Sequence, residues 1–253
     1  MAEPLLRLQG VSKSFGGLAA VQGVSLDVPA GSLSALIGPN GAGKTTLFAL
    51  ISGFVKPDTG SVRFEGQDIT GAEPHRTARL GMTRTFQIVQ PFAQQTVRQN
   101  VAVGAHLHTA GRREALAQAE EVAARVGLGA QLDKAASDLT VAGRKRLELA
   151  RALATRPKLL LLDEVLAGLN PAEIAEMLPV VRRIAEGGIT VLMIEHVMQA
   201  VMNLAQQVWV LAQGQLIAQG TPAQVTRDER VIEAYLGHGT AQRLRRTAAQ
   251  EVS

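Results

Sequence analysis

The chain has 253 residues, 46% of them hydrophobic, and a net charge of only +4. It contains no cysteine, which excludes disulfides, thiolate catalysis and cysteine-based metal sites, and its dispersed basic residues lead us to expect no nucleic-acid partner. The longest apolar runs, at residues 159–162 and 189–194, are far shorter than the ~20 residues that span a bilayer, so we expect a folded cytoplasmic protein without a transmembrane segment or secretory signal.

Short β-type runs dominate the first quarter of the chain. They are separated by Gly, Pro and Asp turns and lie at residues 5–11, 24–28, 33–37 and 61–65. We expect an antiparallel β layer that leads into a Gly-rich loop after residue 37. A helical pattern at 46–52 follows that loop directly.

The middle of the chain is predicted to be mostly helical, with helices at 115–126 and 143–154. Strand-like runs then return at residues 159–162, 189–194, 207–211 and 216–218, with a helix at 171–185 between the first two. Alternating β and α elements indicate a mainly parallel core sheet, so the predicted fold class is α/β. The last residues, 240–253, read as a polar tail.

The Gly-rich loop carries the clearest chemical signal. It consists of Gly38, Pro39, Asn40, Gly41, Ala42, Gly43, Lys44 and Thr45, followed by Thr46, and it fits the phosphate-binding pattern G-x-x-x-x-G-K-[ST]. Glycines let backbone N–H groups surround phosphates, Lys44 adds a full positive charge, and the Thr45 hydroxyl can ligate Mg²⁺. A chance Gly-rich turn would not explain the strand before the loop and the helix after it. The sequence therefore predicts a nucleoside triphosphatase.

A second constellation follows the apolar run 159–162, where Asp163 and Glu164 are adjacent. It resembles a Walker B segment followed by a catalytic acid. Ligands of open α/β sheets bind at the carboxyl ends of strands, so Asp163 is expected to hold Mg²⁺ beside the phosphate loop. Glu164 would then face the attacking water and orient it or take its proton. A solvated acidic turn is the simpler alternative, and the nearby phosphate loop favours the catalytic interpretation.

Lys44 and Asp163 are 119 positions apart (163 − 44), so a substantial insertion separates the two halves of the site. Over nearly its whole length the chain resembles the ATP-binding-cassette (ABC) ATPases, through both Walker segments and the motifs at 85–87, 139–149 and 194–196. The resemblance implies ATP as nucleotide, a RecA-like core sheet, an antiparallel β layer and a helical subdomain. It also implies one domain at 1–239, with a nucleotide-binding core at 1–87 and 157–239 and a helical part at 88–156.

The resemblance also implies roles for three further residues. Gln87 resembles the Q-loop glutamine, which reaches the metal and the water and lies where a membrane partner docks. His196 resembles the switch histidine that contacts the γ-phosphate, and Phe15 lies where the family has an aromatic that stacks on adenine. Taken singly, each residue also has a plainer interpretation: a surface glutamine, a structural histidine and a core phenylalanine.

The signature position departs from the Leu-Ser-Gly-Gly-Gln usual in the family. It is occupied by Leu139, Thr140, Val141, Ala142 and Gly143. Thr140 keeps the hydroxyl, whereas Ala142 adds a methyl group, Gly143 replaces the glutamine, and Asn170 stands where the family has an aspartate. Because in the family this segment closes over the γ-phosphate bound to the other subunit, the resemblance still predicts a head-to-tail dimer that encloses two ATP molecules.

Three segments are similar to the ATP-binding subunits of bacterial branched-chain amino acid importers, most closely to the LivG type. They are residues 82–87 with 91–92, residues 163–171 and residues 231–237. This similarity implies two integral membrane permeases, a second ATPase subunit (identical or different) and, indirectly, a solute-binding protein. The expected location is the cytoplasmic face of the bacterial inner membrane. Ile88, Val89 and Phe92 either line the groove that docks the permease or pack the helical part.

Other functions remain open at this point. ATPases for urea or aromatic acid uptake and for lipopolysaccharide-type export look alike, because the ATPase does not touch the cargo. A non-transport ABC ATPase shares the fold but usually carries coiled-coil insertions, zinc cysteines or two cassettes. A P-loop kinase or GTPase would leave the segment 139–149 and His196 unexplained.

Overall fold

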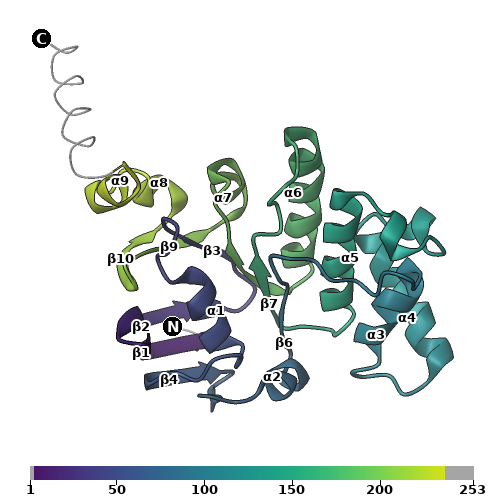
Figure 1. The fold of residues 1–253 in the computed structure, drawn as a ribbon, viewed down its shortest axis with the longest axis horizontal. Coiled ribbons are helices and arrows are strands. Elements are labelled where there is room, and N and C mark those ends of the chain that lie inside the picture. The colour runs from purple at the N-terminus through teal and green to yellow at the C-terminus, as the bar shows by residue number, and fades with distance from the viewer. Residues whose placement is uncertain (1–2, 237–253) are drawn as a thin grey trace, which may run out of the picture.

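The computed structural model of the chain describes residues 3–236. Three sequence predictions fall outside the described residues: the polar tail at 240–253, the domain boundary at residue 239, and residue 237, which ends the segment 231–237. Two sheets and the helices around them make up the fold, and Figure 1 shows their arrangement.

A four-stranded antiparallel sheet contains the start of the chain, as predicted. Its strand order is β2-β1-β4-β5, with β1 at Leu6–Phe15, β2 at Leu18–Val28, β4 at Thr59–Phe64 and β5 at Gln67–Asp68. Leu6 pairs with Val28 on one side and with Phe64 on the other, and all three side chains are buried. The β1–β2 hairpin is longer than predicted, because its outer half is exposed or half-buried apart from Val21 and lacks the apolar alternation that reveals a strand.

The second sheet has six strands in the order β10-β9-β3-β8-β7-β6 and forms the core. Its strands are β3 at Leu33–Ile37, β6 at Met82–Arg84, β7 at Leu159–Asp163, β8 at Thr190–Ile194, β9 at Gln207–Ala212 and β10 at Gln215–Gly220. All neighbours from β9 to β6 are parallel, and only β10 is antiparallel to its neighbour β9. This confirms the predicted mainly parallel sheet, in which β3, β7 and β8 are buried along their whole length.

Most helices flank the two sheets. They are α1 at Lys44–Ile51, α2 at Pro74–Leu80, α6 at Pro171–Glu186, α7 at Met198–Leu204, α8 at Pro222–Val225 and α9 at Glu229–Leu236. None of the helices between residues 3 and 236 is both long and apolar enough to cross a bilayer.

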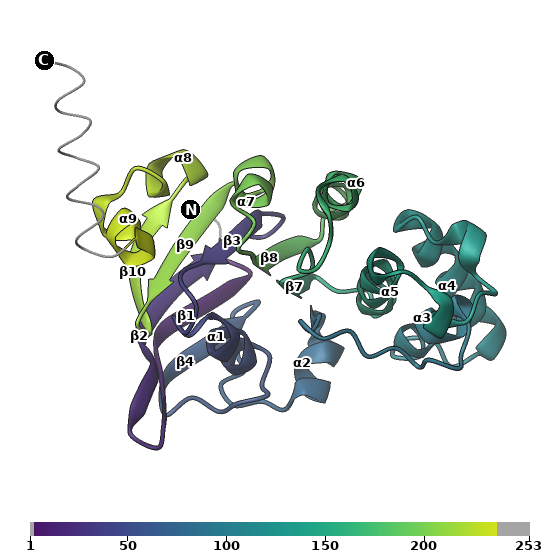
Figure 2. The same cartoon turned by 45° about the horizontal axis from the view of Figure 1, so that its top comes forward.

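The helical middle of the chain lies beyond the β6 end of the core sheet, and Figures 1 and 2 show it at the far side from α9. It contains α3 at Val97–Ala105, α4 at Arg112–Arg125 and α5 at Val141–Leu153, with 3-10 turns at Gly129–Gln131 and Ala136–Asp138. A Cβ on Gly104 of α3 would lie 2.3 Å from the Arg151 carbonyl oxygen of α5, so glycine permits the close approach of these helices. Helix α5 begins two residues earlier than predicted, because the Thr140 hydroxyl accepts a hydrogen bond from Gly143 N at 3.1 Å and caps it.

Candidate nucleotide site

The phosphate loop connects the end of β3 to the start of α1, where the sequence places it. Gly38 has φ 149° and Gly43 has φ 98°, both in a region that disfavours other residues. A Cβ on Gly38 would lie 2.0 Å from the Leu211 carbonyl oxygen, and one on Gly43 would lie 2.2 Å from that of Ala20. These two glycines are therefore required because the loop passes directly against the neighbouring β9 and β2 backbones.

Lys44 is the first residue of α1 and turns its side chain back into the loop. Its Nζ donates hydrogen bonds to the carbonyl oxygens of Gly38 at 2.7 Å and Pro39 at 2.9 Å. The residue is buried, and burial lowers the pKa of Lys44, against the opposing influence of Glu164 and Asp163. A cation held at a helix N-terminus is a suitable partner for phosphate oxygens.

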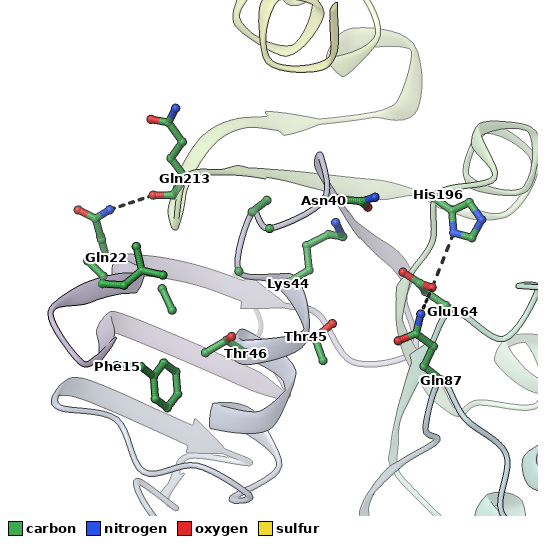
Figure 3. Close-up of a pocket in the computed structure, with 16 residues that line it drawn as sticks. Phe15, Gln22, Asn40, Lys44, Thr45, Thr46, Gln87, Glu164, His196 and Gln213 are labelled. Atoms are coloured by element: carbon green, nitrogen blue, oxygen red, sulfur yellow. Dashed lines mark hydrogen bonds and ion pairs between the residues drawn. The ribbon is translucent and has the colours of Figure 1, made fainter. Parts of the chain in front are cut away.

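The loop forms part of an open cavity of about 1040 Å³, which has room for a nucleotide. Predicted site residues line it from several elements: Phe15, Asn40, Gly41, Ala42, Gly43, Lys44, Thr45, Thr46, Gln87, Glu164 and His196. In Figure 3, Phe15 lies at one end of the cavity, Gln87, Glu164 and His196 lie at the other, and Lys44 and Thr45 lie between them. Phe15 is 48% exposed, and Lys13 Nζ lies 5.6 Å from its ring centroid.

The three catalytic candidates meet at the carboxyl edge of the core sheet, where Glu164 directly follows β7, His196 lies two residues after β8 and Gln87 lies three residues after β6. The Glu164 carboxylate accepts a hydrogen bond from Gln87 Nε2 at 2.7 Å and lies 4.0 Å from His196 Nδ1 (Figure 3). Glu164 has φ 49°, a left-handed conformation that is uncommon for a residue with a side chain. This backbone turn places the carboxylate of Glu164 at the cavity, while that of the adjacent Asp163 is buried.

Asp163 forms a buried ion pair that the sequence did not reveal. Its Oδ2 accepts a hydrogen bond from Arg84 Nη2 at 2.7 Å, and the two side chains are 2% and 7% exposed. The Arg84 guanidinium also lies 5.4–6.0 Å from the ring centroids of Phe48, Phe54 and Phe86. Asp163 Oδ1 is buried and has no hydrogen-bond partner among the described residues. The only sequence signal for Arg84 was a basic residue directly before the 85–87 motif.

The structure places the predicted signature residues elsewhere. Within residues 3–236, none of the segment 139–143 lines the cavity, and Thr140 serves as the N-cap of α5. Asn170, which stands in place of the family's aspartate, caps α6: its Oδ1 accepts from Glu173 N at 3.0 Å, and its own N–H donates to Glu173 Oε2 at 2.9 Å. The side chain of Asn170 therefore has a local structural use.

Two further buried charged residues lie next to this site and were not singled out from the sequence. Lys145 of α5 is 5% exposed, and its Nζ donates to the carbonyl oxygens of Gln87 and Glu164. Glu195 is 1% exposed and accepts a hydrogen bond from Leu166 N at 3.0 Å. Burial raises the pKa of Glu195 to about 7, and the nearby Glu164 carboxylate acts in the same direction.

The segment after Gln87 presents apolar side chains to solvent. Ile88 is 74% exposed and Phe92 is 45% exposed, whereas Val89 is half-buried. Two of the three residues predicted either to line a docking groove or to pack the helical part are thus at the surface.

The loop, the lysine and the two carboxylates meet at the carboxyl edge of one parallel sheet, which makes the molecule a P-loop nucleoside triphosphatase. The model of the ABC transporter family matches residues 21–167, and a model described as branched-chain amino acid ATP-binding cassette transporter matches residues 215–241. The chain belongs to the ABC transporter family and is one of its ATP-binding subunits.

Relatives and solved structures agree over nearly the whole chain. The high-affinity branched-chain amino acid transport ATP-binding proteins BraF of Pseudomonas aeruginosa and LivG of Escherichia coli K12 are 40% and 39% identical to it, and each alignment covers 94% of this chain and 99% of the relative. A solved ATP-binding cassette of an ABC transporter in its ADP conformation is 33% identical, with a TM-score of 0.85 over 94% of this chain and 100% of that one. The predicted family, its likeness to the LivG type and the fold are confirmed.

Proposed function

We propose that the chain hydrolyses ATP to energise an importer of branched-chain amino acids or related small solutes. The observation that carries this proposal is the meeting of Lys44, Gln87 and Glu164 in one cavity, in a chain whose relatives include BraF and LivG. In this proposal the base of ATP stacks on Phe15, and its phosphates lie in the loop against Lys44.

The residues present fit a magnesium ion. Mg²⁺ prefers oxygen ligands and usually shares them with substrate phosphates and water. The Thr45 hydroxyl, the Gln87 amide oxygen and Asp163 Oδ1, which has no hydrogen-bond partner within residues 3–236, would supply the protein's share. In the described part of the chain no group of three or more His, Asp or Glu side chains is arranged to hold a metal by itself, which agrees with a site completed by phosphate. A bound Mg²⁺ would stabilise negative charge on the phosphate oxygens.

Glu164 is the proposed group that acts on water. Its carboxylate is held by Gln87, and it is suited to orient a water molecule or accept its proton. His196, whose side chain is 58% exposed beside Glu164, is the proposed contact of the γ-phosphate. Lys44 binds phosphate in this scheme, so binding and hydrolysis depend on different residues.

A second ATPase subunit would complete the site. Residues 139–143 are the proposed contact with ATP on that subunit, since they lie away from the cavity of their own chain. The exposed Ile88 and Phe92 are proposed to contact a membrane permease, which would place the protein at the cytoplasmic face of the inner membrane. The division into a nucleotide-binding core at 1–87 and 157–239 and a helical part at 88–156 belongs to the same proposal.

The test is to trap Glu164→Gln with Mg-ATP in the native cell, solubilise the membranes gently and identify co-purifying proteins by mass spectrometry. Lys44→Ala, treated identically, is the control for association that does not need ATP. We expect two polytopic permeases, a second ATPase subunit and a solute-binding protein with Glu164→Gln. Recovery of ribosomes, DNA-repair factors or only soluble proteins would contradict the transport function and leave the ATPase in place.

A further inference from the structure

Helix α5 carries a row of charged residues that face inward. Lys145, Glu148 and Arg151 are spaced three residues apart, so they lie on one side of the helix over successive turns. Each of these three side chains forms a hydrogen bond with the backbone of the segment 86–92. This segment contains Gln87 and the exposed apolar residues Ile88 and Phe92. We refer to the three residues as the α5 charged row.

Two members of the row form hydrogen bonds with the first residue of this segment and with a residue near its other end. The Glu148 carboxylate accepts a hydrogen bond from Phe86 N, and Arg151 Nη1 donates one to the Gln90 carbonyl oxygen at 2.9 Å. The Arg151 guanidinium also lies 5.0 Å from the Phe92 ring centroid. Because this part of the chain forms neither helix nor strand, the side chains of α5 satisfy backbone groups that secondary structure would otherwise pair.

Lys145 reaches further than the other two. Its Nζ donates to the Gln87 carbonyl oxygen at 3.1 Å and also to the Glu164 carbonyl oxygen at 3.2 Å. One buried ammonium thus joins α5 to both residues of the Gln87–Glu164 hydrogen bond. Its charge is faced by Glu148 on the same helix and by Glu195 from the end of β8.

The backbone of Glu164 is held from both sides. Its N–H donates to the Ile194 carbonyl oxygen at 3.0 Å, and its carbonyl oxygen accepts from Lys145 Nζ at 3.2 Å and from Ala167 N, in the following turn, at 3.1 Å. The left-handed φ of 49° is therefore maintained by bonds to β8 and to α5. Without the ammonium of Lys145, the carbonyl would lose its tie to α5, and the direction in which the carboxylate points would be less fixed.

We propose that Lys145 is a positioning residue for hydrolysis, which holds the Glu164 carboxylate in place relative to Gln87 and ties both to α5, the helix that Thr140 caps. The inference rests on the proposed role of Glu164. Lys145 does not line the cavity, so it has no direct part in binding ATP. Its removal is expected to slow hydrolysis at saturating ATP and to leave nucleotide affinity unchanged.

The experiment compares Lys145→Met, which removes the ammonium but keeps an apolar stem, with Lys145→Arg, which keeps the charge and the donors. Lys158→Met is the matched control, since the Lys158 ammonium pairs with Glu65 at the surface and does not line the cavity. Steady-state phosphate release gives kcat and KM for Mg-ATP, and a fluorescent ATP analogue gives Kd. We expect Lys145→Met to lower kcat 10- to 100-fold with KM and Kd within twofold of wild type, Lys145→Arg to restore part of the rate, and Lys158→Met to match wild type.

A double mutant separates positioning from general structural damage. If Lys145 acts through Glu164, the Lys145→Met, Glu164→Gln variant turns over no more slowly than Glu164→Gln alone. Additive losses would overturn the proposal, as would a wild-type kcat or a raised Kd in Lys145→Met. Should Lys145→Met not fold, Lys145→Gln, which has a shorter and uncharged donor, replaces it in both the single and the double mutant. Wild-type turnover by Glu164→Gln would instead remove the proposed role of Glu164, and the positioning role with it.

Discussion

Replacing Glu195 with glutamine is expected to change how the stability of the protein depends on pH. The side chain is 1% exposed, Oε1 accepts from Leu166 N, and Oε2 is buried without a partner in the part of the chain that the structure describes. Burial raises the pKa of this carboxyl and is the largest influence; the hydrogen bond from Leu166 N lowers it, Glu164 raises it and Lys145 lowers it by smaller amounts. Glutamine keeps the acceptor for Leu166 N and has the shape of the protonated acid, so it removes the ionisation with little change in packing.

The size of the effect follows from the difference in pKa between the folded and unfolded states. Burial raises the pKa of Glu195 from 4.5 to about 7, so the folded protein binds this proton more tightly than the unfolded chain does. The stabilisation is fully present below pH 4.5 and is lost as the pH rises through 7. Between pH 5 and pH 8 the wild-type protein should lose about 2–3 kcal/mol through this group, which for a chain of this size is about 5–10 °C in Tm.

The assay is urea unfolding, followed by circular dichroism, of wild type and Glu195→Gln at pH 5, 6, 7 and 8. We expect the advantage of the variant over wild type to grow by about 2–3 kcal/mol across this range. Glu121→Gln on the exposed surface of α4 is the matched control and should show no such trend. A constant difference between Glu195→Gln and wild type from pH 5 to pH 8 would refute the reasoning.

Three further predictions concern the nucleotide and its buried support. Lys44→Ala should raise the Kd for ATP at least ~100-fold in equilibrium dialysis, because the loop loses its charge; a Kd within threefold of wild type would contradict this. Phe15→Ala should weaken ATP binding by about 1–2 kcal/mol while Phe15→Trp binds normally, and equal Kd values for the two variants would argue against stacking. Arg84→Met should lower the free energy of unfolding by about 3–5 kcal/mol in urea, because Asp163 is left buried without its cation; a loss below ~1 kcal/mol would show that this pair contributes little.

The sequence predicted the parts of the site that depend on local pattern. A buried strand, a Gly-rich loop and a helix follow one another along the chain, so residues 33–52 identify the phosphate loop without knowledge of distant contacts. The position of Asp163 and Glu164 followed from a similar local pattern, because an apolar run that ends in two acids predicts a buried strand in a chain that alternates α and β elements. The same reasoning gave the parallel sheet.

Features that depend on distant partners were not predictable. Strand β6 has three residues, which is too short for a recognisable alternation, and its one partner among residues 3–236 is β7. Arg84 contacts Asp163 from 79 positions away, and Lys145 reaches Gln87 from 58 positions away. Buried charges of this kind look like surface residues in a sequence, since their environment is set by tertiary packing.

The central claim is that Lys44 binds the nucleotide and Glu164 acts on water, and one measurement separates the two roles. Purified Glu164→Gln is given Mg-ATP, and both its Kd and its rate of phosphate release are compared with those of wild type. We expect a Kd within about threefold of wild type and a rate at least ~100-fold lower, because the amide binds in the same place but cannot accept a proton. Turnover close to wild type would contradict the account and remove Glu164 from the reaction.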